Sequence, residues 1–270
     1  EGDFKPYYAN FIPGLKGILQ NANGKEYRML RGKAMECISL IGVAVGKEAF
    51  AQDDKDVMDL IIKTQHATVA EEGRLDSDDP QISFMLQACG RICKCLGEQF
   101  QPYLPYVIPP LINSANADPE LKVLDADDDD DQEDEEGIES VTVALRGGGH
   151  KRISIRTSAL EEKATACTML STYAEELKEA FFPYVSQVAQ ALIPLIKFQY
   201  LDDVRTAAMG AMPELLSSCV GALKVGVQGA TPEIVCQLKD TMFEPILEQL
   251  VHEPDPESLA VVLDSGNMVI

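Results

Sequence analysis

The stretch FKPYYANFIPGL, residues 4–15, decides the fold because the chain repeats it. It returns as FQPYLPYVIPPL from Phe100, 96 residues further on, with Pro and Tyr at the same offsets. A third copy, FPYVSQVAQALIPLI from Phe182, places its Pro-Tyr pair 81 residues after that of the second. Recurrence of one element at long intervals is typical of a repeat protein.

Apolar residues between the copies recur at helical spacing, as Leu30, Ala34, Cys37, Ile38 and Ile41 show. Helix pairs that repeat every ~40 to 47 residues are typical of HEAT and armadillo arrays, and both intervals are about two such periods. We therefore predict an all-α fold, an α-α superhelix of HEAT repeats in which first and second helices alternate. First helices are expected at 3–20, 54–69, 101–115, 181–199 and 231–251, and second helices at 26–46, 80–98, 158–178, 202–219 and from 256 onward.

The clearest second helix is DDVRTAAMGAMPELL, residues 202–216. Asp202 or Asp203 is expected to cap its start, and Arg205 is expected to point along the groove. Three first helices should bend at an internal proline, which removes a backbone hydrogen bond. These prolines are Pro13, Pro109 and Pro194.

One connector, residues 116–157, interrupts the helical pattern. IESVTVAL and KRISIRT alternate with period two around RGGG and predict a small β-hairpin. Before it, the segment from Asp125 to Glu136 holds ten carboxylates and no basic residue. A second acidic connector, AEEGRLDSDDPQ from Ala70, also joins a first helix to its second, so both should lie along one rim. We expect one HEAT array over residues 1–270, with about four and a half helix pairs, as a piece of a longer chain.

Composition favours basic partners. The 270 residues carry a net charge of −21, and without the ten carboxylates of that segment 34 acidic residues still face 23 basic ones, a balance of −11. An acidic surface disfavours nucleic acids and steers basic molecules toward the protein. No run reaches the ~18 apolar residues of a membrane span. Seven cysteines without regular spacing indicate reduced, packed thiols in a soluble intracellular protein.

The sequence gives little support for a catalytic site, a phosphate-binding loop or a metal site. None of the three histidines adjoins a Ser or Cys in a nucleophile motif, and RGGGHKR lacks the G-K-[ST] ending of a phosphate loop. CGRICKC has no second pair to complete a tetrahedral metal site, so buried cysteines are the better interpretation. The acidic segment fits no calcium-loop frame. We predict a non-enzyme without a cofactor, with Tyr7, Tyr103 and Tyr184 as repeat-packing residues.

Three long motifs resemble the importin-β (karyopherin-β) family of nuclear transport receptors, in particular its importin-five or karyopherin-beta-three type. They are DDPQISFMLQACGRICKCLG, LEEKATACTMLSTYAEELKEAFFPYV and DDVRTAAMGAMPELL. The resemblance implies a right-handed superhelix whose concave face, lined by second helices, binds the basic nuclear localisation signals of cargo proteins. It also implies cargo release by Ran-GTP, contact with Phe-Gly nucleoporins through other parts of the chain, and shuttling between cytoplasm and nucleus. A scaffold subunit without Ran dependence is the alternative.

An acidic insertion in a central repeat is a feature of the family, and in relatives it touches cargo or Ran. This chain has GIESV where relatives carry a Trp, so contacts that need the indole are in question. The insertion is interpreted as an electrostatic lure, a decoy in the cargo groove, or a passive connector. SALEEKATAC turns Leu160, Ala164 and Cys167 toward the core and leaves two glutamates beside them. The candidate partner-binding residues are Asp125, Asp127, Asp128, Asp129, Asp130, Asp131, Glu133, Asp134, Glu135, Glu136, Glu161 and Glu162.

Overall fold

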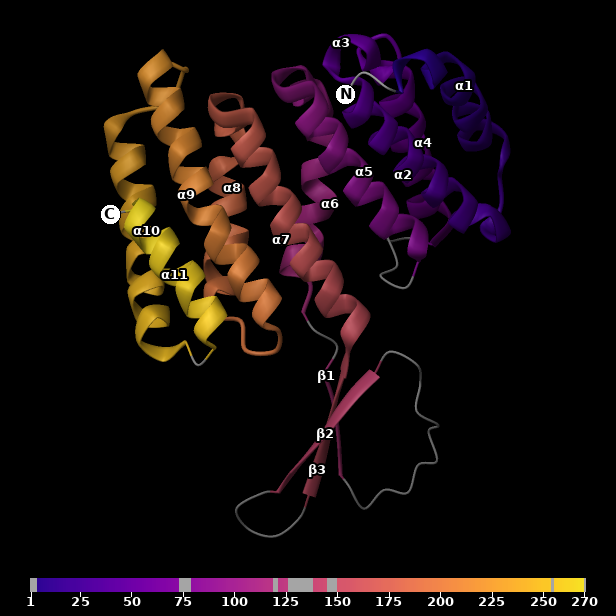
Figure 1. The fold of residues 1–270 in the computed structure, drawn as a ribbon. Coiled ribbons are helices and arrows are strands. Elements are labelled where there is room, and N and C mark those ends of the chain that lie inside the picture. The colour runs from indigo at the N-terminus through magenta and orange to yellow at the C-terminus, as the bar shows by residue number, and fades with distance from the viewer. Residues whose placement is uncertain are drawn as a thin grey trace.

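The computed structural model describes residues 4–72, 79–118, 121–125, 138–144, 150–253 and 255–269. Within these ranges, pairs of helices follow one another along the array, which confirms the predicted helical solenoid (Figure 1). The first helices are α1 (Lys5–Asn21), α4 (Asp54–Glu72), α6 (Leu104–Asn116), α8 (Phe182–Leu192) and α10 (Pro232–His252). The second helices are α2 (Arg28–Val45), α5 (Pro80–Leu96), α7 (Thr157–Leu177), α9 (Asp202–Val225) and α11 (Pro256–Val269). Short segments join them: α3 (Lys47–Phe50) and the 3₁₀ helices η1 (Lys25–Tyr27), η2 (Gly97–Tyr103), η3 (Lys178–Phe181) and η4 (Ile193–Lys197).

The helices form two layers. In one layer the second helices pack side by side, with α2 against α5, α7 against α9, and α9 against α11 (Figure 1). The first helices, such as α1 and α4 or α6 and α8, approach one another much less. Because the inner layer of a curved double layer brings its helices closer together, we identify the second helices as the inner layer.

An aromatic pair marks the start of the first helix in each copy of the repeated motif. The ring centroids lie 5.5 to 6.1 Å apart in the pairs Phe4–Tyr7, Phe100–Tyr103 and Phe181–Tyr184. The third copy therefore begins at Phe181, one residue before the predicted Phe182. Tyr103 and Tyr184 are half-buried against the core, as predicted, whereas Tyr7 is 55% exposed, so the packing role predicted for Tyr7 is wrong.

Prolines shape the first helices in two ways. Pro13 in α1 and Pro109 in α6 stay inside α-helices. Pro194 instead lies in η4, where the α-helical part of this first helix has already ended at Leu192. The predicted single helix 181–199 is thus a succession of shorter segments, because proline cannot supply the N–H that an α-helix needs there.

Each second helix buries one polar residue near its start, and we call this set the polar ladder. Its members are Arg31, Gln81, Lys163, Arg205 and Ser258, each at most 8% exposed. Arg31 donates from Nε to Gln81 Oε1 at 2.6 Å and from a terminal nitrogen to the Ala22 carbonyl at 2.7 Å. Lys163 likewise donates to the Ala115 carbonyl. Cations placed at the carbonyls that end the first helices are electrostatically favourable, so the three cations of the ladder, Arg31, Lys163 and Arg205, each join the second helix of a pair to the chain that ends the first.

Arg205 corrects two local predictions. It is 7% exposed and does not point along an open groove, because its guanidinium pairs with Glu253 at 2.8 Å. The N-cap of α9 is Leu201, which offers no side-chain acceptor. Asp202 accepts from Arg205 at 2.6 Å instead of capping the helix, since the buried cation is its stronger partner.

The insertion between α6 and α7 contains an antiparallel sheet with strand order β1-β3-β2. Its strands are β1 (Leu121–Asp125), β2 (Ile138–Ala144) and β3 (His150–Arg156). The predicted hairpin is confirmed, with Ile138 opposite Arg156 and Ala144 opposite His150. β1 was not predicted because LKVLD shows no clean alternation. The sheet projects from the edge where α6 ends and α7 begins (Figure 1). Most of the acidic segment, residues 126–137, lies outside the described residues.

The cysteines are free thiols, and their predicted packing holds for six of the seven: Cys37, Cys89, Cys93, Cys95, Cys167 and Cys219 are buried or half-buried. The prediction is wrong for Cys236, which is exposed on α10. Within the ranges that the structure describes, we find no helix long and apolar enough to cross a membrane.

Candidate partner-binding surface

The second helices leave one face free, and we call these exposed faces together the inner surface. On α7, Glu161, Thr168 and Glu175 are exposed and recur every seven residues. On α9, exposed Asp203 and Ser217 lie fourteen residues apart. Seven residues are close to two turns of an α-helix, so each set lies on one side of its helix. The spacing therefore exposes a row of side chains along each of these helices.

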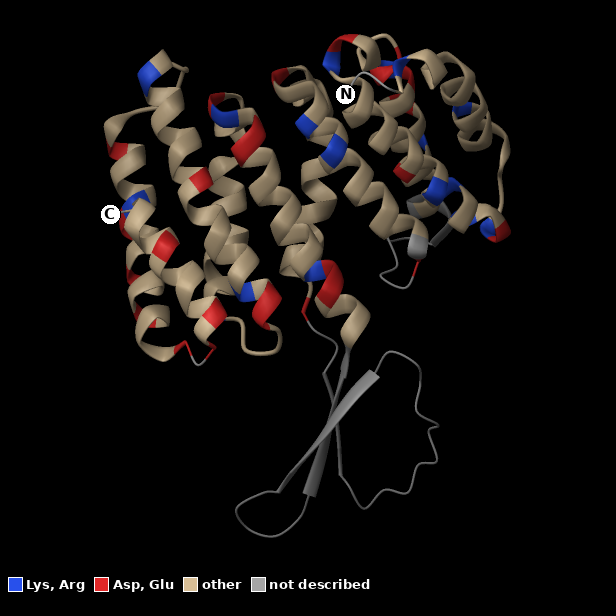
Figure 2. Ribbon diagram, viewed as in Figure 1, with Lys and Arg blue, Asp and Glu red and all other residues tan. Residues whose placement is uncertain are grey.

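Charge is unevenly distributed over the inner surface (Figure 2). On α5, half-buried Arg91 donates to Gln87 Oε1 at 3.1 Å, and Lys94 is exposed one turn further on. The helices α7, α9 and α11 carry carboxylates that are exposed or half-buried: Glu161, Glu175, Asp203, Glu214, Glu257 and Asp264. The surface thus changes from basic on α5 to acidic from α7 onward.

Glu175 on α7 and Glu214 on α9 are like-charged neighbours. Partial burial and the nearby carboxylate of Glu175 raise the pKa of Glu214 above its ordinary value. No ion pair with Lys or Arg is found for either glutamate among the residues that the structure covers. A cation brought by another molecule would relieve this repulsion, because an opposite charge favours the ionised carboxylates.

The predicted site residues do not form one cluster. Glu161 is exposed on the inner surface, near the start of α7. Glu162 is half-buried and accepts a hydrogen bond from Ser114 Oγ of α6 at 2.5 Å, so this oxygen is directed toward the first-helix layer. Asp125 ends β1, at the register position opposite Lys151 of β3. The nine remaining carboxylates, between 127 and 136, lie outside the described residues.

Sequence reasoning missed Glu175 and Glu214. The heptad spacing from Glu161 through Thr168 could have identified Glu175. Glu214 offered no such signal, since its proximity to Glu175 depends on how α9 packs against α7. Among described residues, no group of three or more His, Cys, Asp or Glu side chains could hold a metal ion.

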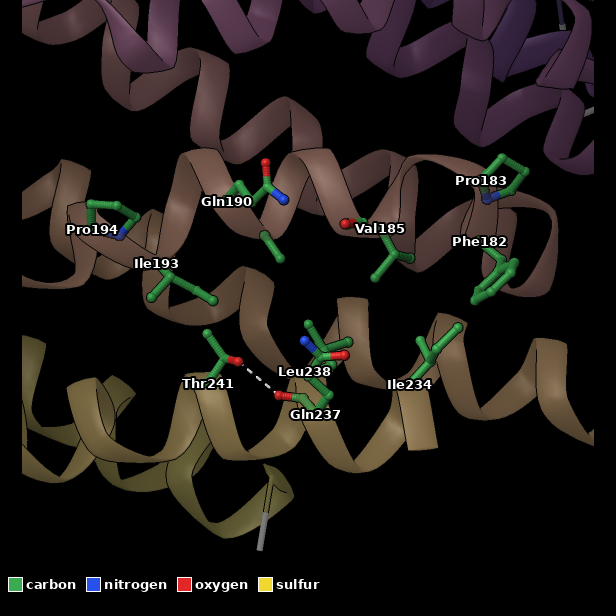
Figure 3. A pocket seen from close by; sticks show the side chains of 12 residues that line it. Phe182, Pro183, Val185, Gln190, Ile193, Pro194, Ile234, Gln237, Leu238 and Thr241 are labelled. Carbon is green, nitrogen blue, oxygen red and sulfur yellow. Dashed lines mark hydrogen bonds between the residues drawn. The ribbon is translucent and has the colours of Figure 1, made fainter. Parts of the chain in front are cut away.

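A second surface feature lies on the first-helix layer, between α8 with η4 and α10 (Figure 3). It is a groove with a volume of about 730 Å³. Phe182, Val185 and Ile193 line one side, and Ile234 and Leu238 line the other. None of the described residues that line it is charged. The groove suits an uncharged, apolar segment.

Comparisons with known proteins find relatives over nearly the whole chain. It is 32% identical over 263 residues to importin subunit beta-3 of Saccharomyces cerevisiae, covering 97% of this chain and 23% of the relative. It is 30% identical over 267 residues to a probable importin-5 homolog of Dictyostelium discoideum, covering 97% of this chain and 22% of the relative. The chain thus spans under a quarter of the length of these curated relatives. No protein-family model matches it.

Solved structures show the same similarity. The crystal structure of Kap121p bound to Ste12p matches with a TM-score of 0.80 at 30% identity, covering 100% of this chain and 24% of that one. Other matching crystal structures contain Kap121p bound to Nup53p and to RanGTP. The helical array described above is therefore the architecture of a known solenoid.

Proposed function

This chain belongs to the importin-β family, and on that premise we propose that it forms part of a nuclear import receptor. Such a receptor binds basic cargo segments on its inner surface and loses them when it binds Ran-GTP. Structures of Kap121p with Ste12p and with RanGTP support both halves of this cycle. The receptor acts by binding rather than catalysis, and it shuttles between cytoplasm and nucleus.

The observation that carries the proposal is the acidic part of the inner surface, on α7, α9 and α11. There, Glu175 and Glu214 are close enough for their charges to interact, and they lack an intramolecular cation within the described ranges. Exposed ion pairs contribute roughly 0 to 1 kcal/mol each, so binding has to sum several of them. An extended Lys- and Arg-rich segment suits such a row of carboxylates better than a compact ligand does.

The acidic insertion is assigned the role of a lure in this proposal. Its carboxylates, from Asp125 through Glu136, would raise the encounter rate with a basic cargo or with the basic surface of Ran. Glu161 is exposed on the inner surface near the start of α7, the helix that follows β3 in the chain. Glu162 can contribute only through its second carboxylate oxygen, because Oε1 accepts the hydrogen bond from Ser114.

The uncharged groove between α8 and α10 is assigned to apolar partner segments. Contact with Phe-Gly nucleoporins was expected through other parts of the chain. Among described surfaces, however, this groove has the chemistry that phenylalanine side chains require. The crystal structure of Kap121p bound to Nup53p supports only the wider point that a family member binds a nucleoporin.

The proposal is tested by charge neutralisation in the intact protein. Glu175→Gln together with Glu214→Gln should weaken binding of a Lys-rich peptide several-fold, measured by titration calorimetry. Asp240→Asn with Glu244→Gln makes the same charge change on exposed residues of α10, in the other layer, and should leave affinity unchanged. Equal effects of the two pairs would contradict the assigned surface. Displacement of the peptide by Ran-GTP separates a receptor from a scaffold, which would not respond.

A further inference from the structure

The junction between α5 and α7 differs from the other junctions of the inner layer. Helices α2 and α5 pack together along their lengths, and so do α7 and α9, whereas α9 and α11 share a smaller contact and α5 and α7 share the smallest of the inner layer. In the other layer, α4 and α6 scarcely meet, although the rings of His66 and Tyr106 lie 6.3 Å apart; α8 and α10 meet as little, but η4 and α9 both contact α10. The array therefore divides into one stack from α1 to α5 and another from α6 to α11.

Polar contacts hold each stack together. In the first stack, Arg31 of α2 bonds to Gln81 of α5 at 2.6 Å. In the second, Ser218 of α9 donates to the Ala174 carbonyl of α7 at 3.2 Å, and Arg205 pairs with Glu253 at 2.8 Å. Directional bonds of this kind fix the relative position of neighbouring helices.

The contacts in the middle of the α5–α7 junction are apolar or aromatic. Gly90 of α5 lies so close to Met169 of α7 that a Cβ at Gly90 would stand 2.7 Å from the Met169 sulfur. Phe100, which follows α5 in η2, stacks on Tyr173 of α7 with ring centroids 5.5 Å apart and planes 20° apart. Such contacts are attractive but weakly directional, so they tolerate rotation of one helix against the other.

Tyr173 adds a specific reason for this junction to open. Its side chain is fully buried, and its hydroxyl has no hydrogen-bond partner among the described residues. An unpaired buried hydroxyl disfavours the closed packing, because in an opened junction the same group would bond to water. The other large side chains that are most completely buried are apolar.

We infer that the array bends at the α5–α7 junction, as a hinge between two stiffer stacks, and that the buried Tyr173 hydroxyl favours the open form. The hinge also separates the basic part of the inner surface from the acidic part. Basic α5 belongs to one stack, and acidic α7, α9 and α11 belong to the other (Figure 2). Bending would change the distance between them. The inference goes beyond cargo binding and does not depend on it.

The test compares two distances in the intact protein by pulsed electron paramagnetic resonance. Spin labels on unnatural amino acids at Leu40 of α2 and Thr168 of α7 span the hinge, and labels at Thr168 and Asp264 of α11 span an equal number of helices within one stack. All three positions are exposed, and the native cysteines stay unlabelled. We expect the distance distribution across the hinge to be at least twofold broader. Tyr173→Phe should narrow it toward the width of the other pair.

Tyr184→Phe is the matched control, because Tyr184 is half-buried in α8, away from the hinge, and should change neither width. Equal widths in the native protein would overturn the hinge. A broad distribution that Tyr173→Phe leaves unchanged would overturn the role of the hydroxyl, and with it the inference as stated.

Discussion

Two tyrosine hydroxyls in this array have opposite surroundings, and the difference is visible only in three dimensions. Tyr8 of α1 donates to Asp53 Oδ2 at 2.9 Å, and Asp53 also accepts from Lys16 at 3.0 Å. Burial and this carboxylate raise the pKa of Tyr8, so the hydroxyl stays a donor. The Tyr173 hydroxyl has no partner within the described ranges. Sequence alone does not distinguish the two residues, since both lie within predicted helices.

We expect the two Phe substitutions to change stability in opposite directions. Tyr8→Phe removes a hydrogen bond to a charged acceptor and should lower the free energy of unfolding by about 1.5 to 3 kcal/mol. Tyr173→Phe removes an unpaired buried hydroxyl and should raise it by up to about 1 kcal/mol. Urea unfolding of the two variants and the native chain measures both values. A loss of stability in Tyr173→Phe equal to that in Tyr8→Phe would show that the buried hydroxyl has a partner.

At the scale of elements, most helices of both layers were predicted to within three residues at each end, but α9 runs to Val225, six residues beyond the predicted 219. The periodic apolar face of α7 places its observed ends within one residue of the prediction, 158–178. The first helix around Phe182 was predicted as one segment, but the structure divides it at Leu192 because Pro194 ends the α-helical pattern. Strand β1 escaped prediction, since its pairing with β3 is a long-range contact without a local signature.

Contacts between elements could not be predicted from the sequence either, as Glu253 illustrates. This residue follows α10 and has a fully buried side chain that pairs with Arg205 near the start of α9. The hydrogen bond from Arg205 lowers the pKa of Glu253 below its ordinary value of 4.5. The pair thus joins the last two repeats, and only the packing of α10 and α11 on α9 brings its members together.

Glu253→Gln should destabilise the last repeat by about 1 to 3 kcal/mol at neutral pH, because it leaves Arg205 with a weaker partner. The effect should depend on pH in a defined direction. A carboxyl group with a lowered pKa in the folded state stabilises the fold above its ordinary value of 4.5, and this contribution is lost as pH falls through the folded pKa. The native chain should therefore lose more stability than the variant between pH 6 and pH 3, by thermal unfolding. Parallel pH profiles would contradict the linkage.

At the scale of the whole molecule, self-similarity predicted the architecture and composition predicted the acidic bias of the surface. The paired helices, the order of the layers along the chain and the acidic bias all follow from patterns in the sequence. The reversal of charge between α5 and α7 does not, because it depends on which side of each helix is left uncovered by its neighbours. The weak α5–α7 junction likewise results from differences in packing that no single helix encodes.

The last prediction concerns the acidic insertion and its effect on the rate at which a basic cargo binds. Replacement of Asp127, Asp128, Asp129, Asp130 and Asp131 by serine should slow the association of a basic cargo with the intact receptor if the insertion is a lure. The reason is that many exposed charges raise the encounter rate even when each pair contributes little. The difference should fade at high salt, because the Debye length is only ~8 Å at physiological ionic strength. Stopped-flow binding at low and high salt measures it. A decoy would give the opposite sign, with tighter cargo binding after replacement, and an unchanged rate at low salt would reduce the insertion to a passive connector.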